Sequence, residues 1–535
     1  MIRLNTADFR HGRSLVITLI VALVLSSSSL LRVQAAAGDL DPTFGTGGKV
    51  TTGPNATATG LAIQNDGKLV VVGGFAATRY NTDGSLDSSF GIGGRVTTSF
   101  FFSPTSVAIQ PDGKIVIGGN SIFIRSLFAL TRLNTDGSAD SSFGVSGKVT
   151  TDFSPSDAGV NAIALQPDGK IVAAGFRGPV TRQNASDFAL ARYNAGGSLD
   201  VSFGSGGKVT TDFLGLADVA NAVAIQPDGK IVAVGYNNVT AVAEFLFNFA
   251  LARYNSDGSP DASFGSGGKV TTEFFGSYDE ARAVIIQPGG KLVVAGTASN
   301  PFQESFSDFG LVRYNSDGGL DATFGDNGKV MTDFNSEFDD AWALTQQQDG
   351  RLVVAGQSED SQERSDFALA RYNANGELDA TFGSDGRAKT DFFGFDDGVR
   401  AVALQNDGKI VAAGVANDVI EDQFQVYIAV ARYDGVSFDI CLQDDGNEAL
   451  FQFNSMSGDY QFTNCIGVTI GGTGVISRRG STITLQQNGP DRRVLVQIDG
   501  GVNKGTASVQ LLSQRTTFTI TDRNTLNNTC SCEAR

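Results

Sequence analysis

The residues of this sequence that could do chemistry are mainly carboxylates and arginines. The chain contains 57 Asp and Glu but a single histidine, His11, near its start. Beyond that position, Ser-His-Asp and Cys-His nucleophile systems and His-ligated metal sites are therefore excluded. Carboxylate-only chemistry, such as glycoside hydrolysis by two acids, stays open. No acid pair is marked above the others, so the sequence indicates a protein that is not an enzyme.

Three of the most prominent residue types recur once in each of seven copies of an internal repeat. A Phe precedes a Gly in every copy: Phe44, Phe90, Phe143, Phe203, Phe264, Phe324 and Phe382. An Asp stands three residues before each: Asp41, Asp87, Asp140, Asp200, Asp261, Asp321 and Asp379. An Arg also recurs: Arg79, Arg132, Arg192, Arg253, Arg313, Arg371 and Arg432. An active site needs one asymmetric set, so sevenfold repetition predicts a structural role, with Phe between repeats and Arg paired with Asp.

Four β-strands are predicted in each copy of the repeat. In the fourth copy, strand a spans 222–226, strand b 230–235, strand c 249–255 and strand d 268–272. A Pro-Asp-Gly turn joins a to b, and alternating bulky and small residues mark c. Seven copies of this length suit propeller blades. We therefore expect an all-β, seven-bladed β-propeller over residues 38–435.

The number of strands predicts how the ring closes. The first d strand, 49–52, precedes every a–b hairpin, and the last c strand, 427–433, has no d strand after it. If strand a is innermost, 49–52 completes the final blade as a strap and removes an open edge. Blades in the order d-a-b-c would need no strap. We favour the strap because strands a and b are the most apolar.

Three motifs that recur together also suggest a family. They are Leu-Asp-x-x-Phe-Gly-x-x-Gly-Lys-Val, Gln-Pro-Asp-Gly-Lys-Ile-Val and Phe-Ala-Leu-Ala-Arg-Tyr-Asn. Over residues 38–435 the chain resembles the delta-60 repeat family of exported bacterial proteins. That resemblance implies a propeller fold and implies no activity.

The two ends of the chain differ from the repeats. Residues 1–37 have a basic start, an apolar run and small residues, which predicts a cleaved signal peptide rather than a membrane anchor. Export would make the protein secreted or periplasmic, and the family resemblance implies a bacterial source. Residues 436–535 have alternating β patterns and predict a small sandwich or barrel. We expect its four cysteines to form two disulfides, with three connectivities open, rather than a zinc site: Cys441, Cys465, Cys530 and Cys532.

Charge narrows the choice of partners. The formal net charge is −17, and removal of residues 1–37, with four arginines and one aspartate, would make it −20. This excludes nucleic acid and anionic membranes as favoured partners. The a–b turns and c–d loops should share one face, and the longer, more varied b–c and d–a loops the other. Acidic residues are concentrated on the second face, and they form either a solvated acidic rim or a face that binds cations: Asp218, Asp279, Asp339 and Asp397.

The Asn-x-Asp-Gly-x-x-Asp stretch of 81–87 is a second candidate for calcium binding, because it resembles half of a calcium loop. An Asx-type turn is the favoured interpretation, because the upstream position of a calcium loop is taken by the repeated Arg. Trp342 is expected in the core. We therefore predict a monomeric, non-enzymatic binding scaffold without a cofactor, which binds an unknown protein or glycan on its varied loops. The alternative is a calcium-dependent hydrolase or lactonase-like propeller that uses carboxylates.

Overall fold

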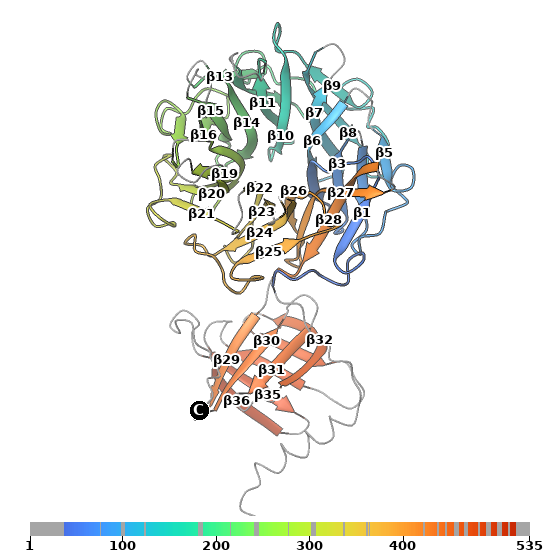
Figure 1. Ribbon diagram of the computed structural model, residues 1–535, viewed down its shortest axis with the longest axis vertical. Helices are drawn as coiled ribbons and strands as arrows, with labels where there is room; N and C mark the ends of the chain where they lie inside the picture. The colour runs from blue at the N-terminus through green and yellow to red at the C-terminus, as the bar shows by residue number, and fades with distance from the viewer. Residues whose placement is uncertain are drawn as a thin grey trace, which may run out of the picture. The chain divides into compact units, whose positions relative to one another are not determined.

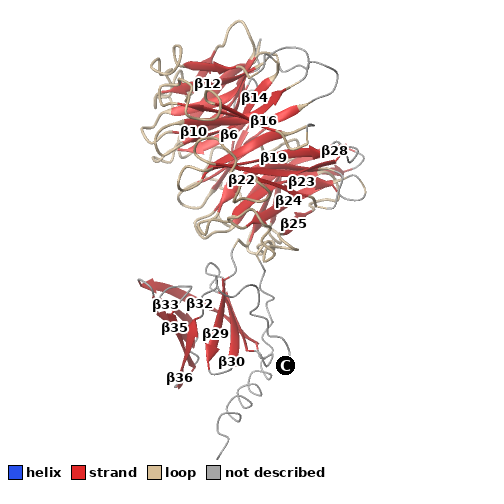
Figure 2. Cartoon of the chain, turned by 90° about the vertical axis from the view of Figure 1, so that its left-hand side faces the viewer, coloured by secondary structure: helices blue, strands red, loops and turns tan. Residues whose placement is uncertain are grey.

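The computed structural model describes residues 37–435, except for short gaps, and the backbone of strands between 438 and 520. The gaps are 75, 98–101, 122–124, 180–185, 214–215, 240–245, 276–277, 301–305, 335–337, 360–361, 363 and 421–422. Every regular element in this part is a strand, and none is a helix (Figure 2). Consequently no described helix could cross a membrane. The predicted signal peptide lies outside the described residues.

Seven four-stranded sheets form the blades, and each strand pairs antiparallel with the next. Blade 1 consists of β2 (Gly60–Ile63), β3 (Leu69–Gly73), β4 (Ala76–Tyr80) and β5 (Arg95–Thr97). Blade 2 consists of β6 (Phe102–Ile109), β7 (Ile115–Ser121), β8 (Leu127–Leu133) and β9 (Lys148–Thr151). Blade 3 consists of β10 (Ala158–Leu165), β11 (Ile171–Arg177), β12 (Asp187–Tyr193) and β13 (Lys208–Thr211). Blade 4 consists of β14 (Asp218–Ile225), β15 (Ile231–Asn238), β16 (Phe247–Tyr254) and β17 (Lys269–Thr272). Blade 5 consists of β18 (Glu280–Ile286), β19 (Leu292–Asn300), β20 (Phe306–Tyr314) and β21 (Lys329–Thr332).

The remaining two blades follow the same order, and the last of them uses the first strand of the chain. Blade 6 is β22 (Asp339–Gln346), β23 (Leu352–Glu359), β24 (Ser365–Tyr372) and β25 (Arg387–Thr390). Blade 7 is β26 (Asp397–Leu404), β27 (Ile410–Ile420), β28 (Gln423–Tyr433) and β1 (Lys49–Thr52). The first strand of each blade lies nearest the centre of the ring (Figure 1). Strands a to d are thus the first to fourth strands of a blade.

The predicted strap is confirmed. Strand β1 pairs antiparallel with β28, with Lys49 opposite Ala431 and Thr52 opposite Ile428. The loop before β1 completes the missing c–d connection, since Gly38 N–H donates to the Asp434 carbonyl at 2.8 Å and Asp434 N–H to Asp39 at 2.9 Å. The pairing of β1 with β28 excludes the d-a-b-c order.

The hydrophobic core lies between blades, because each sheet is covered on both sides by its neighbours. Strand b is the most buried, and all five residues of Leu69–Gly73 are buried. One core cluster joins Val411 and Val430 of blade 7 to Leu69 and Tyr80 of blade 1. Apolar packing therefore continues across the junction that the strap closes.

The repeated Arg, Asp and Phe form one shared contact at each blade junction. In blade 4, Arg253 Nε donates to Asp261 Oδ2 at 2.7 Å, and its guanidinium lies 4.4 Å from the centroid of the Phe264 ring. Through Nη1 the same Arg donates to the Ser316 carbonyl of the next blade. The predicted structural role is confirmed, since all seven Phe side chains are fully buried and the seven Arg repeat these contacts.

The strap carries the seventh copy of this contact. Arg432 donates to Asp41 at 2.7 Å and to the Thr82 carbonyl of blade 1. Burial opposes ionisation of Asp41, but hydrogen bonds from Thr43 and Lys409 and the charge of Arg432 lower its pKa to about 2. Asp41 is therefore an ionised partner in a buried network.

The Asn-x-Asp-Gly stretches are turns, as predicted. Asp83 Oδ1 accepts hydrogen bonds from the backbone and the hydroxyl of Ser85, at 2.9 and 2.6 Å. At the end of the stretch, Asp87 is paired with Arg79 and Lys68 at 2.8 and 3.0 Å. Protein cations thus take the carboxylate that a calcium loop would use.

After the propeller, the described backbone forms a closed antiparallel barrel of eight strands. They are β29 (Phe438–Asp444), β30 (Asn447–Phe453), β31 (Asp459–Asn464), β32 (Thr469–Arg479), β33 (Thr482–Gln487), β34 (Val494–Asp499), β35 (Gly505–Leu511) and β36 (Gln514–Ile520). Cys441 lies in β29, whereas Cys465, Cys530 and Cys532 fall outside the described residues. The two disulfides stay a prediction.

Candidate functional site

The two ends of the ring are unlike. Antiparallel pairing places every a–b turn and c–d loop at one end, and every b–c and d–a loop at the other. We call the second end the variable-loop face. The first end carries the same turns and ion pairs in each copy, whereas the variable-loop face differs between blades. Differing loops on a rigid scaffold are where binding sites usually lie.

The four aspartates predicted as an acidic face sit at the start of strand a, one in each of blades 4 to 7. They are buried, with side chains at most 1% exposed: Asp218, Asp279, Asp339 and Asp397. One carboxylate oxygen of each accepts the backbone N–H of a Phe five residues earlier, at 2.7 Å in every case: Phe213, Phe274, Phe334 and Phe392. The interpretation as a solvated rim is wrong for these four, because each closes the turn between strands d and a.

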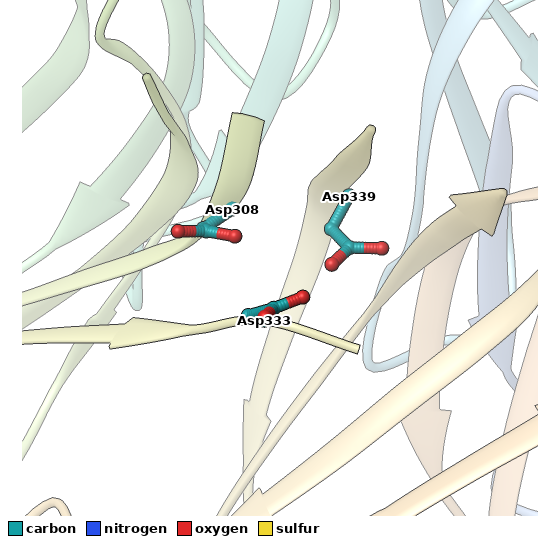
Figure 3. A group of neighbouring side chains, drawn as sticks. All are labelled: Asp308, Asp333 and Asp339. Carbon is teal, nitrogen blue, oxygen red and sulfur yellow. The ribbon is translucent and has the colours of Figure 1, made fainter. Parts of the chain in front are cut away.

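Two of these aspartates also belong to carboxylate triplets that the sequence interpretation missed. Asp339 lies with Asp308 and Asp333 (Figure 3), and Asp397 lies with Asp366 and Asp391. In each triplet one oxygen per residue lies within 4.8 Å of the others. The three members come from the start of strand c, the end of strand d and the start of the next strand a.

Spacing in the sequence marks the two triplets but also marks Asp187, Asp212 and Asp218, where Asp187 pairs with Arg177 at 3.4 Å. Asp308, Asp333 and Asp339 are separated by 25 and then 6 residues, and the triplet of Asp366 repeats these intervals. Blade 4 has Asn248 at the place of Asp308. The triplet is therefore a variable addition to the repeat.

Crowding changes the protonation of these acids. Burial, together with the charges of Asp333 and Asp339, raises the pKa of Asp308 to about 6. Burial likewise raises the pKa of Asp397 to about 7, although Phe392 N–H opposes the shift. Such groups can take up a proton near neutral pH or share a hard cation such as Ca²⁺.

A second variable feature lies on the innermost strands, close to the same face. From blade 2 to blade 7 strand a contains a β-bulge, and the bulged residues are Thr105, Asn161, Asn221, Arg282, Trp342 and Arg400. Thr59 takes the equivalent place in blade 1. A bulge turns one side chain out of the regular alternation, and bulges are common beside binding sites.

In blades 1 to 4 the side chain at this place bridges to the next blade. Thr59 and Thr105 donate through their hydroxyls to the carbonyls of Pro104 and Val160, at 3.0 and 2.8 Å. Asn161 and Asn221 do the same through their amides, to Ala220 and Ala281, both at 2.9 Å. Small polar residues therefore suffice to link neighbouring inner strands.

Blades 5 to 7 replace these small residues with a stack. The guanidinium carbon of Arg282 lies 3.5 Å from the centroid of the Trp342 ring, and that of Arg400 lies 4.1 Å from it. The arginines come from the two blades that flank the tryptophan. Trp342 is half-buried, so the prediction that it belongs to the core is wrong. We call these three residues the Arg–Trp–Arg stack.

Acceptors next to the stack hold its arginines in place. Glu280 Oε2 accepts from Arg282 Nη2 at 2.9 Å and from Tyr278 at 3.0 Å, and Glu280 Oε1 accepts from Asn221 at 2.9 Å. Arg400 Nη1 donates to Gln357 at 3.1 Å. Burial and the charge of Arg282 lower the pKa of Arg400 to about 10, while Asp340 opposes the shift.

Comparison with protein families supports the fold and leaves the activity unassigned. Six of the repeats match a family model described as "Domain of unknown function (DUF5122) beta-propeller", at residues 64–90, 110–143, 166–203, 226–264, 287–324 and 347–382. These matches support a β-propeller family of unknown function. No curated protein matches the chain.

Solved structures with a similar fold are distant in sequence. Virginiamycin B lyase from Staphylococcus aureus is 10% identical with a TM-score of 0.41, and the match covers 71% of this chain and 97% of that one. A protein of unknown function from Dyadobacter fermentans is 12% identical at 0.39, covering 74% and 100%. An ulvan lyase is 12% identical at 0.37, covering 74% and 93%. Likenesses this weak say nothing about activity.

Proposed function

For a chain built from a propeller repeat of unknown function, we propose an exported, non-enzymatic binding scaffold that takes its ligand on the variable-loop face. The Arg–Trp–Arg stack is the observation that supports this most. It replaces small bridging residues in three consecutive blades, so the inner strands of blades 5 to 7 carry side chains that closure of the ring does not require. Variation of this kind on a uniform scaffold is typical of a recognition surface.

Exposed aromatic side chains occur in the d–a loops that lead into the same three blades. Phe275 precedes β18 and is 44% exposed, Phe338 precedes β22 and is 37% exposed, and Phe393 and Phe395 precede β26 and are 37% and 36% exposed. Aromatic residues are enriched in recognition surfaces because they offer a large contact area at a low entropic cost. They add an apolar component to the face.

The wider setting is part of the proposal. The chain would belong with the delta-60 repeats, reach the periplasm or the exterior through residues 1–37, and act as a monomer on a protein or glycan. Its C-terminal β domain would be held by two disulfides. The acidic composition, with a net charge of −17, argues against nucleic acid.

The test compares exposed apolar side chains at the two ends of the ring. The full-length protein is immobilised and screened against glycans and exported proteins, and each ligand is then measured against two variants. Phe393→Ser with Phe395→Ser alters the variable-loop face. Ile92→Ser with Val145→Ser removes exposed apolar side chains, 91% and 81% exposed, from c–d loops at the other end. We expect only the first pair to weaken binding; the reverse result would overturn the proposal.

A calcium-dependent hydrolase or lactonase-like enzyme is the second candidate. The two carboxylate triplets favour it, because oxygen ligands within 4.8 Å of one another suit a hard cation. Thermal unfolding with and without calcium, together with a screen for glycan and lactone turnover, separates the candidates. A large rise in Tm with calcium and measurable turnover would replace the scaffold proposal.

A further inference from the structure

The Arg–Trp–Arg stack contains more hydrogen-bond donors than acceptors. Each guanidinium has five N–H groups and the indole has one. Two of these donors, Arg282 Nε and Trp342 Nε1, are buried and have no hydrogen-bond partner among the described residues. Buried donors without partners are rare and costly. The stack therefore presents donors that an added acceptor would satisfy.

The stack is also a buried concentration of positive charge. The side chain of Arg282 is only 10% exposed. Glu280 pairs with Arg282 at 2.9 Å, but that carboxylate is shared with Asn221 and Tyr278. Asp340, the carboxylate that acts on Arg400, accepts a hydrogen bond from Thr297 at 2.9 Å. Both nearby carboxylates are thus already engaged by other groups.

A purely structural role does not account for these residues. At the equivalent place in blades 3 and 4, Asn161 and Asn221 reach the next inner strand with two amide hydrogen bonds each and bring no charge there. Arg282 and Arg400 instead bring two cations to one indole ring. Since the chain as a whole is strongly acidic, with a net charge of −17, only a local group of cations could attract an anion.

We propose that the Arg–Trp–Arg stack binds an oxyanion, the carboxylate, sulfate or phosphate group of a ligand held on the variable-loop face. Planar guanidinium groups fit such oxygens with paired, charge-assisted hydrogen bonds. Trp342 Nε1 supplies a further donor and its ring holds both arginines. This inference rests on the proposed function and names the chemical class of its ligand.

The chain contains its own reporter for the test, because Trp342 is its only tryptophan. Emission of Trp342, excited where tyrosine does not absorb, is followed while the full-length protein is titrated with galacturonate, sulfate or phosphate. Galactose is the uncharged counterpart of galacturonate. We expect a saturable change with at least one oxyanion and none with galactose; the preferred oxyanion distinguishes a uronate, a sulfated or a phosphorylated ligand.

The variants reproduce residues that the chain itself uses at this place. Arg400→Asn gives blade 7 the residue found in blade 4, leaves the pair of Arg282 and Glu280 intact, and should weaken oxyanion binding by about tenfold or more. Arg282→Asn should weaken oxyanion binding at least as much. Because this substitution also removes one partner of Glu280, Arg400→Asn is the variant that tests the proposal. Arg125→Asn removes an equal charge from blade 2 and should leave the affinity unchanged.

The outcomes separate this inference from the proposed function. It is overturned if no oxyanion changes the emission of Trp342, if galactose matches galacturonate, or if Arg400→Asn binds as tightly as the wild type. If one of these three results is obtained while a ligand found in the screen still needs Phe393 and Phe395 for binding, the proposed binding face stands and only the oxyanion assignment fails. If the screen gives no ligand and sulfate alone binds, the oxyanion site stands and the scaffold proposal fails.

Discussion

At the residue scale, the repeated and unrepeated side chains do different things. Arg253 joins three structural elements, since it pairs with Asp261, covers Phe264 and donates to the next blade. Arg282 and Arg400 do not follow that pattern and instead lie on Trp342. Sevenfold repetition thus marks residues that hold the ring together, and its interruption marks candidates for recognition.

Removal of a repeated Arg should destabilise the propeller. Arg253→Ala leaves Asp261 buried without its main partner, so we expect the free energy of unfolding to fall by about 3 kcal/mol. Lys230→Ala removes a second cation from the same carboxylate, but its side chain is 29% exposed, so the loss should stay below about 1 kcal/mol. Denaturant unfolding of both variants measures the difference; equal losses would contradict a structural role specific to Arg253.

The triplet of Asp308 should make stability depend on pH. Its folded pKa of about 6 lies above the ordinary 3.8, so its contribution to stability is complete below about pH 4 and is lost as the pH rises through 6. Asp308→Asn, which copies Asn248 of blade 4, should therefore be more stable than the wild type at pH 8, by about 1 kcal/mol after allowance for solvent screening.

The comparison is made by thermal unfolding at pH 4 and pH 8 in calcium-free buffer. The advantage of Asp308→Asn should disappear at pH 4, where Asp308 is protonated. Glu377→Gln, at an exposed side chain, removes the same charge and should change stability by less than about 0.5 kcal/mol at either pH. An equal effect of both variants would show that net charge, rather than the triplet, is responsible.

At the element scale, the strap and the bulges have separate roles. Strand β1 supplies the outer strand of blade 7, while Asp41 and Phe44 before it supply the seventh Arg–Asp–Phe contact. The bulges in strand a add no strand pairing, yet they set the side chains that face the neighbouring inner strand. Ring closure thus uses the outer edge of blade 7, and the residues proposed for recognition lie on the inner edges of blades 5 to 7.

Deletion of residues 38–52 should prevent cooperative folding of the propeller, because Arg432 would lose Asp41 and β28 would become an open edge. A permuted chain, with 37–52 moved to follow Gly435, provides the control. Gly38 already donates to Asp434 as Gly258 donates to Asn255, so the join would recreate an ordinary c–d loop. We expect the permuted chain to unfold near the Tm of the wild type; a stable deletion variant would contradict the strap.

Sequence periodicity predicts the strands and the closure well, because turn residues and alternation are local properties. The number of strands leaves the strap and the d-a-b-c order open, and the apolar character of strands a and b favours the strap. The bulges could not be foreseen, since an extra residue in one strand shows only in the pairing with its neighbour. Trp342 was therefore placed in the core, although its bulge position leaves it half-buried. The triplet of Asp308 was missed because its members come from different strands, although its regular spacing was visible.

At the scale of the whole propeller, one end is uniform and the other is not. Buried ion pairs and turns recur at the a–b and c–d end, whereas the Arg–Trp–Arg stack, the carboxylate triplets and the exposed Phe side chains occur near the variable-loop face of blades 5 to 7. Among the described residues, these three features are thus concentrated in blades 5 to 7. This concentration is the reason why we propose a binding function.

The most direct test follows the indole N–H resonance of Trp342 by NMR, since the chain has one tryptophan and so one such signal. The nitrogen-15-labelled protein is titrated with galacturonate, sulfate or phosphate, with galactose as the control. If the unrepeated residues of the inner strands form the recognition site, at least one oxyanion should shift this resonance to saturation, and Arg400→Asn should remove most of the shift. A resonance unmoved by every oxyanion, or moved equally by galactose, would contradict the account.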